Sequence, residues 1–222
     1  MEKVPYRPKL DGAPGAAAPV SMPEAPAQWR TALPVLRGKR VVLRELCQSD
    51  AVSLHALLTA EEVARFTSLP PTTVEGFEKF IAWCLRQRAA GEYVCFAVTL
   101  QGFDTAIGIF QLKYLRPGIG TPEWGFSIGS AFWGTGVFEE ASQLVLEFAF
   151  NTVGIERLEA RAAVQNGRGN GALKKVGAVQ EGILRKSLLR DGCYLDQALY
   201  AIIGDEWRAL RDAVSTPRLY LH

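Results

Sequence analysis

Histidine is scarce in this chain, and its cysteines are not grouped. The 222 residues include two histidines, His55 and His222, and four cysteines, none of which forms a Cys-x-x-Cys pair. A zinc site, a disulfide framework or a histidine-dependent catalytic triad would therefore have few residues to draw on. We expect no metal ion.

Long apolar runs and an excess of one charge are also missing. No stretch approaches the ~20 apolar residues that span a bilayer, and the N-terminus lacks the basic and apolar regions of a signal peptide. The 25 Lys and Arg residues nearly balance the 23 Asp and Glu residues, which argues against a protein that coats nucleic acid. We therefore expect a cytoplasmic enzyme or binding domain without a membrane or nucleic-acid partner.

Proline is concentrated at the N-terminus. Seven of the twelve prolines lie between Pro5 and Pro34, interleaved with Ala and Gly. Because proline removes an amide donor and fixes φ, we expect residues 1–35 to form an arm, either disordered or extended across the body or a neighbouring subunit, with Tyr6 and Trp29 as anchors. The folded domain is expected over residues 36–213 and a tail over residues 214–222.

The rest of the chain alternates between the period of strands and the period of helices. Short β-rich runs bounded by Gly or Pro predict strands, and apolar residues at helical spacing predict helices. A meander of three consecutive strands indicates antiparallel pairing, so we expect a mixed α+β sheet of about seven strands with five helices. The expected strands are 41–46, 93–100, 106–114, 123–128, 158–164, 179–189 and 194–203, and the expected helices are 51–58, 72–91 with Thr72 as its cap, 137–151, 171–176 and one that begins at Asp205.

Over residues 123–141 a strand leads through a glycine-rich turn directly into an amphipathic helix. The first helical turn has amide groups without internal partners and a partial positive charge, and Gly134 and Gly136 would let the backbone approach a phosphate closely. Such a turn suits a pyrophosphate. The alternative is an ordinary tight connection, which an isolated Gly-x-Gly favours.

The motifs around this turn resemble those of the GNAT superfamily, in particular its ribosomal-protein alanine N-acetyltransferase branch. That branch has a Glu-x-Gly-Tyr/Phe strand, a Trp-Gly-x-Gly turn and a Glu-Ala helix start, followed later by an Asn-x-x-Ser segment. The likeness extends from about Leu36 to Trp207 and implies a twisted, mostly antiparallel sheet with helices on both faces. The matching residues are Glu123, Gly125, Phe126, Trp133 to Gly136, Glu140, Ala141 and Asn166 to Ala178.

The resemblance implies that acetyl-CoA is the cosubstrate and lies along this strand and turn. Its thioester would be held near Ser127 and Ile128, its pyrophosphate by the amides of residues 134–138, and its pantetheine near Asn166. The expected cofactor-binding residues are Ser127, Ile128, Trp133, Gly134, Thr135, Gly136, Val137, Phe138, Asn166 and Asn170.

Two positions depart from the family pattern. Phe138 stands where a small residue is usual, so its ring must either turn into the core, which we expect, or obstruct the phosphates. Gly169 replaces a serine that often contacts the cofactor and can help to protonate the leaving thiolate, and no other acid is obvious. Arg168 and Lys174 could meet the 3′-phosphate, although basic residues at such positions are more often solvated.

Glu123 is the expected catalytic residue. A primary amine with a pKa near ~10 is mostly protonated at neutral pH, and a carboxylate that reaches it directly or through water can remove the proton. Glu123 begins the strand that the resemblance assigns to the cofactor. The alternative, which we weigh equally, is that Glu123 pairs with a nearby Arg or Lys and only secures the strand.

These inferences favour an acetyl-CoA-dependent N-acetyltransferase that transfers the acetyl group directly to a primary amine, either a protein N-terminus or a small amine. The alternative is a GNAT-fold binding module that has lost catalysis and acts through protein or CoA binding, for which Phe138 and Gly169 are the motive. A nucleotide-binding protein fits less well, because the turn lacks the Lys and Ser/Thr of a P-loop. Edge strands and the N-terminal arm are compatible with a homodimer.

Overall fold

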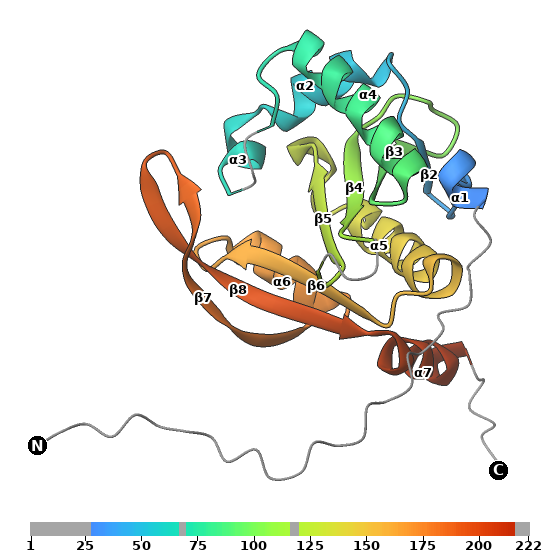
Figure 1. The fold of residues 1–222 in the computed structure, drawn as a ribbon, viewed down its shortest axis with the longest axis vertical. Coiled ribbons are helices and arrows are strands. Elements are labelled where there is room, and N and C mark those ends of the chain that lie inside the picture. Colours follow the sequence, from blue (N-terminus) through green and yellow to red (C-terminus); the bar gives the residue numbers. More distant parts are fainter. Residues whose placement is uncertain (1–27, 67–69, 116–119, 216–222) are drawn as a thin grey trace, which may run out of the picture.

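A single eight-stranded sheet organises the chain (Figure 1). The computed structural model describes residues 28–66, 70–115 and 120–215. The strands follow the order β1-β2-β3-β4-β5-β6-β8-β7, and every neighbouring pair is antiparallel except β5 and β6. The strands are β1 (Leu36–Arg37), β2 (Val41–Glu45), β3 (Tyr93–Leu100), β4 (Gly108–Lys113), β5 (Glu123–Ile128), β6 (Arg157–Ala163), β7 (Val179–Arg190) and β8 (Cys193–Ile203).

Helices cover both faces of this sheet. Helices α2 and α4 pack on one face, and α5 packs on the other. A 3₁₀ turn over Ser130–Phe132 precedes α5, and a π-helical segment over Phe148–Val153 continues it. The helices are α1 (Gln28–Thr31), α2 (Asp50–Leu58), α3 (Glu61–Ala64), α4 (Val74–Ala90), α5 (Val137–Glu147), α6 (Gly167–Lys175) and α7 (Gly204–Ser215).

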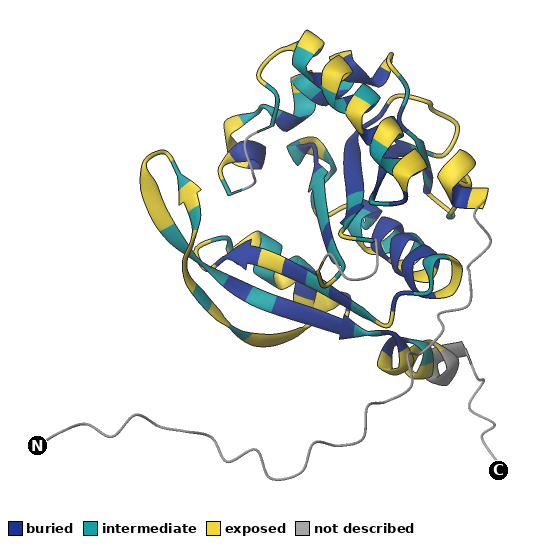
Figure 2. Cartoon of the chain, in the orientation of Figure 1, coloured by how far each residue is buried: buried dark blue, intermediate teal, exposed yellow. Residues whose placement is uncertain are grey.

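Strands β3 and β4 are buried on both faces because a helical layer covers each face of the sheet. Along β3, alternate side chains point to opposite sides of the sheet. Val94 and Phe96 belong to the apolar cluster beneath α5, whereas Cys95 and Ala97 belong to the cluster beneath α2 and α4. Figure 2 shows the contrast between these buried strands and the exposed far end of the β7–β8 hairpin.

The expected α+β sheet is confirmed, with small differences at its elements. The eighth strand is β1, which has two residues and is too short to give a pattern in the sequence. Helix α6 begins earlier than expected because the Asn166 side chain accepts a hydrogen bond from the Gly169 amide and caps it. The cap of α4 is Thr73, whose hydroxyl accepts from the Gly76 amide at 3.0 Å, and not Thr72.

The ends of the chain lie outside the described residues. Residues 1–27, which include Tyr6, and residues 216–222 are not described, so the expected arm and tail stay predictions. Residues 28–35 carry α1, where Trp29 is buried in the cluster beneath α5 together with Leu33. No helix within the described ranges combines the length and the apolar character that crossing a bilayer requires.

Candidate active site

The strands β5 and β6 separate immediately after they meet. They run parallel, and their register contains one pair, Glu123 opposite Glu159. The amide of Glu159 donates to the carbonyl oxygen of Pro122 at 2.9 Å. Strand β5 is paired along its whole length with β4, and β6 along its whole length with β8. The sheet therefore opens between β5 and β6, and the backbone of β5 beyond Glu123 has no strand on that side.

The register with β4 determines which backbone groups face this opening. The Gly129 amide donates to the Ile107 carbonyl at 2.9 Å. Because an antiparallel ladder alternates its bonds, the backbone of Ser127 also faces β4, whereas Phe126 and Ile128 point their amides and carbonyls to the opening. The Ile128 carbonyl accepts a hydrogen bond from Trp133 Nε1 at 2.9 Å. Ser127 thus presents its side chain, on the same face as Glu123, rather than its amide.

The turn after β5 leaves a row of amide donors at the start of α5. Gly134 and Gly136 have φ values of 74° and 84°, in the left-handed region that favours glycine. Among the described residues, the amides of residues 134–139 have no hydrogen-bond partner. These donors and the positive end of the helix dipole form an anion cradle. A Cβ atom on Gly134 would have nothing within 4 Å, so the cradle is open at that point.

The turn between β1 and β2 holds this cradle in place. The Glu140 carboxylate accepts hydrogen bonds from the amides of Lys39 and Arg40. The Arg40 guanidinium in turn donates to the carbonyl oxygen of Thr135 at 2.9 Å. Gly38 lies beside the Glu140 carboxylate. A Cβ atom at this position would overlap the carboxylate, so a larger residue would have to displace it. The sequence marks Glu140 only as part of a family motif and does not mark Arg40 at all, because the contact joins residues about a hundred positions apart in the chain.

Phe138 turns its ring towards the sheet. The ring centroid lies 4.5 Å from that of Phe126 and 6.0 Å from that of the buried Phe110. The ring belongs to an aromatic group between α5 and the sheet, while its amide stays in the cradle. This is the orientation into the core that we expected from the sequence.

Trp133 and α6 form the other side of the opening. The Arg168 guanidinium lies over the Trp133 ring, 4.3 Å from its centroid, so it joins the start of α6 to the turn before α5. Arg168 is exposed. The sequence suggests either a phosphate or solvent as the surroundings of Arg168 and does not indicate this contact with Trp133.

The two candidate asparagines have different surroundings. Asn170 Oδ1 accepts from the hydroxyl of Tyr200 at 2.9 Å, and its Nδ2 donates to the carbonyls of Ala163 and Asn166 at 2.9 and 2.7 Å. This side chain therefore ties β6, β8 and α6 together. Asn166 caps α6 through Oδ1 at 2.8 Å from the Gly169 amide, and its Nδ2 has no hydrogen-bond partner among the described residues.

Glu123 lies at the point where β5 and β6 part. Its side chain is 14% exposed, and its carboxylate oxygens lie 3.4 Å from Lys113 Nζ and 3.6 Å from Arg161 Nη1. Glu159, its partner across the register, pairs with Arg157 at 2.9 Å and also lies 4.0 Å from Arg161, so Arg161 bridges the two carboxylates. Glu123 thus makes the ion pairs with Lys and Arg that the sequence suggests as the alternative to a catalytic role. They hold the carboxylate beside the opening, on the face that α4 covers.

Comparison with known proteins agrees with this geometry. The sequence model of the Acetyltransferase (GNAT) domain matches residues 40–179. The chain belongs to the GNAT acetyltransferase family. It is an acetyl-CoA-dependent acetyltransferase, and the β5–β6 opening with the amide cradle at α5 is its candidate cofactor site. Within the described residues there is no group of three or more His, Cys, Asp and Glu side chains arranged to hold a metal ion.

Individual relatives extend this family likeness over most of the chain. The N-acetyltransferase YoaA of Bacillus subtilis is 26% identical over 175 residues, which cover 77% of this chain and 97% of that protein. The [Ribosomal protein uS5]-alanine N-acetyltransferase of Escherichia coli is 31% identical over 83 residues, 37% of this chain and 43% of that enzyme. A structure of Mycobacterium smegmatis RimJ in complex with CoA-disulfide has the same fold, with a TM-score of 0.70 and 22% identity over 78% of this chain and 89% of that chain.

Proposed function

We propose that this GNAT protein transfers the acetyl group of acetyl-CoA directly to a primary amine, which is a protein N-terminus or a small amine. The main support is the continuity of the site. The backbone amides that β5 turns to the opening, those of Phe126 and Ile128, and the cradle amides of residues 134–139 form one run of free donors, interrupted by the 3₁₀ turn between them. A thioester carrier with a diphosphate needs such a run of donors.

Each part of the site has a role in this proposal. The amides of residues 134–139 bind the diphosphate, with Trp133, Thr135 and Val137 shaping the turn. The backbone of Phe126 and Ile128 and the free Nδ2 of Asn166 bind the pantetheine, while Asn170 keeps Asn166 and β6 in position. Bound acetyl-CoA supplies an acetyl group as a thioester. The amine nitrogen attacks the acyl carbon, so that a C–N bond forms, the C–S bond breaks and CoA leaves as its thiolate. The RimJ complex with CoA-disulfide, which has the same fold, supports a CoA ligand by analogy.

Glu123 accepts the proton that the amine loses. Its carboxylate lies at the closed end of the opening and is held there by Lys113 and Arg161. From this position it takes the proton directly or through a water molecule. Ser127 lies on the same face of β5 as Glu123, so its hydroxyl is also directed to the side of the sheet on which Glu123 lies.

Direct transfer is in keeping with the borders of the opening, which provide no thiol for an acyl-enzyme. Strand β5, the turn of residues 129–136, strand β6 and helix α6 contain no cysteine. The relative that acts on an alanine of ribosomal protein uS5 supports a protein N-terminus as one class of acceptor.

The test is steady-state kinetics of CoA release by the full chain, with acetyl-CoA and an amine varied together. Direct transfer gives intersecting lines in a double-reciprocal plot, and parallel lines would contradict it. Glu123→Gln should lower kcat about 100-fold with little change in the KM for acetyl-CoA. Glu159→Gln is the matched control, since Glu159 shares the register position and has the same exposure, but its nearest ion-pair partner is Arg157 at 2.9 Å and it lies 4.0 Å from Arg161. If acetyl-CoA binds and no amine releases CoA, the binding-module reading is correct instead.

A further inference from the structure

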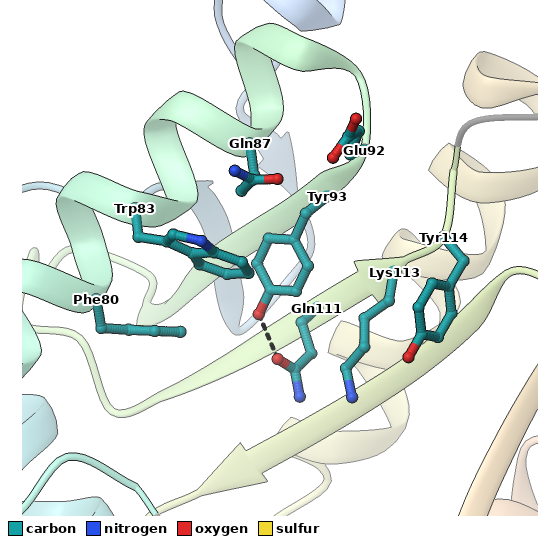
Figure 3. Close-up of a pocket in the computed structure, with 8 residues that line it drawn as sticks. All are labelled: Phe80, Trp83, Gln87, Glu92, Tyr93, Gln111, Lys113 and Tyr114. Carbon is teal, nitrogen blue, oxygen red and sulfur yellow. Dashed lines mark hydrogen bonds between the residues drawn. The ribbon is translucent and has the colours of Figure 1, made fainter. Parts of the chain in front are cut away.

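A cavity lined by aromatic side chains lies beside Glu123, outside the cofactor site. It has a volume of about 450 Å³ and lies between the C-terminal half of α4 and the strands β3 and β4 (Figure 3). This size is in the range of small-molecule sites. The lining residues are Phe80, Trp83, Gln87, Glu92, Tyr93, Gln111, Lys113 and Tyr114.

Three rings form one wall of this cavity, hereafter the aromatic pocket. The rings of Phe80 and Trp83 stack, with centroids 6.2 Å apart and planes 22° apart, and the Trp83 and Tyr93 centroids are 4.8 Å apart. Trp83 is 39% exposed although α4 otherwise buries its apolar face, so part of the indole is open to the cavity. Tyr114, opposite these rings in Figure 3, is 47% exposed. A flat ring inserted here would contact aromatic surface that now faces water.

The floor of the aromatic pocket leads to Glu123. Tyr93, Lys113 and Glu123 are consecutive cross-strand partners on β3, β4 and β5, so their side chains lie on one face of the sheet. Burial raises the pKa of Tyr93, whose neutral hydroxyl donates to Gln111 Oε1. The Gln111 side chain in turn lies over Gly125, where a Cβ atom would be 2.9 Å from its Nε2.

This arrangement fixes what a ligand in the pocket can reach. Neighbouring strands are about 5 Å apart, so a group held above β3 and β4 lies one to two strand spacings from β5. A short alkyl chain spans that distance. A ring in the pocket would therefore place an attached amine near the Glu123 carboxylate and the β5–β6 opening. The Lys113 ammonium is paired with Glu123 at 3.4 Å, and Arg161 lies 3.6 Å from the same carboxylate, so the charges at this end of the pocket are compensated.

We propose that the aromatic pocket binds an aromatic ring carried by the acceptor amine, and so selects acceptors with a ring a few bonds from the nitrogen. This inference rests on the proposed acetyl transfer. The ring belongs either to a small arylalkylamine or to the first side chain of a protein N-terminus. In both cases Trp83 and Tyr93 stack on the ring, and the amine extends over Gln111 to Glu123.

The experiment compares matched acceptors with the full chain and acetyl-CoA. The small amines are 2-phenylethylamine and n-butylamine, and the peptides differ only in having Phe or Ala as their first residue. The chain should favour the phenyl-bearing member of at least one pair by about 10-fold in kcat/KM, and Trp83→Ala should abolish most of that preference. Trp83→Phe should retain it. Phe103→Ala is the matched control, because Phe103 is 71% exposed in the turn after β3 and does not line the pocket.

A second readout separates this inference from the proposed function. Calorimetric titration of phenylethylamine and of the Phe-first peptide into the chain saturated with CoA measures binding without turnover. Binding that Trp83→Ala weakens about 10-fold supports the pocket even if no acetyl group is transferred. A preference within one pair of acceptors identifies the source of the ring. Acetyl transfer with no preference in either pair, or a preference that Trp83→Ala leaves intact, overturns the inference.

Discussion

Arg40 Nη1 donates a 2.9 Å hydrogen bond to the carbonyl oxygen of Thr135, which joins the start of β2 to the turn before α5. The Glu140 carboxylate adds a second link between these segments by accepting a 3.0 Å hydrogen bond from the Arg40 amide. The peptide groups of the cradle are thus oriented from a part of the chain about a hundred residues away in sequence. A cradle that is oriented before the ligand arrives loses less entropy on binding.

Replacing Arg40 should therefore weaken the binding of acetyl-CoA more than it slows the chemistry. We expect Arg40→Ala to raise the KM for acetyl-CoA about 5- to 10-fold, which corresponds to about 1 kcal/mol, the value of one typical hydrogen bond, with kcat nearly unchanged. Arg37→Ala is the control, since Arg37 is an exposed arginine of the same hairpin. Equal KM values for both variants in steady-state kinetics would show that the contact does not position the cradle.

The aromatic contact of Phe138 leads to a second prediction. Because the ring packs on Phe126 and Phe110, Phe138→Ala should lower the free energy of unfolding by about 2 kcal/mol, less than for a fully buried phenylalanine. The affinity for CoA should stay within a few-fold of that of the unaltered chain. Urea unfolding and calorimetric titration measure the two effects. A clear gain in CoA affinity would mean that the ring obstructs the phosphates.

The sequence predicts the sheet well because the apolar residues of the strands follow the pattern of their burial. β3 and β5 lie at the expected residues, since a continuous apolar run in β3 and an alternating one in β5, each bounded by Gly or Pro, limit where the strand can begin and end. The start that the sequence predicts for α6 is four residues too late. Glycine has a low helix propensity, so residues 167–170 show little helical pattern, but the Asn166 cap begins the helix there. The two residues of β1 are too few for any period to be read.

The site could be located from the sequence but not completed. The glycines of the turn and the helix after it are compatible with an anion cradle, and the resemblance of the surrounding motifs to the family favours it over an ordinary tight connection. Which amides of β5 face the opening depends on its register with β4, so the open amides are those of Phe126 and Ile128 and not that of Ser127. Arg40 and Trp83 were missed for a different reason. Their importance comes from tertiary contacts with Thr135 and Tyr93, and no motif marks such contacts.

Gly169 provides a third prediction, because the family has serine at this position. A Cβ atom on Gly169 would lie 2.5 Å from Asn166 Nδ2, so Gly169→Ser must displace the side chain that caps α6. We expect a loss of about 1 kcal/mol in the free energy of unfolding and a weaker affinity for CoA. Gly171→Ser is the control in the same helix, since a Cβ atom there has nothing within 4 Å. If both serines behave alike in thermal unfolding and calorimetric titration, the Asn166 cap does not depend on glycine.

The last prediction concerns stability in acid and depends on Asp50, which is 3% exposed. Burial alone would raise the pKa of Asp50, but hydrogen bonds from Arg44 and from the Cys47 amide outweigh it and hold the pKa below its usual value. A carboxylate whose pKa is lowered by folding stabilises the protein above the pKa of the unfolded state, and this contribution disappears as the pH falls through the folded-state pKa. Asp50→Asn should therefore cost about 3 kcal/mol in the free energy of unfolding at pH 7, and the difference from the unaltered chain should shrink below pH ~4.

Asp104→Asn is the matched control for that prediction. Asp104 pairs with the same arginine, 2.6 Å from Arg44 Nε, but it is 85% exposed, so water and salt screen the pair. Its removal should change the free energy of unfolding by less than about 1 kcal/mol at any pH. Urea unfolding of the three proteins between pH 3 and pH 7 measures both effects. A constant gap between Asp50→Asn and the unaltered chain across that range would exclude an ionised, stabilising Asp50, because protonation of the native carboxylate must remove the advantage of the charge.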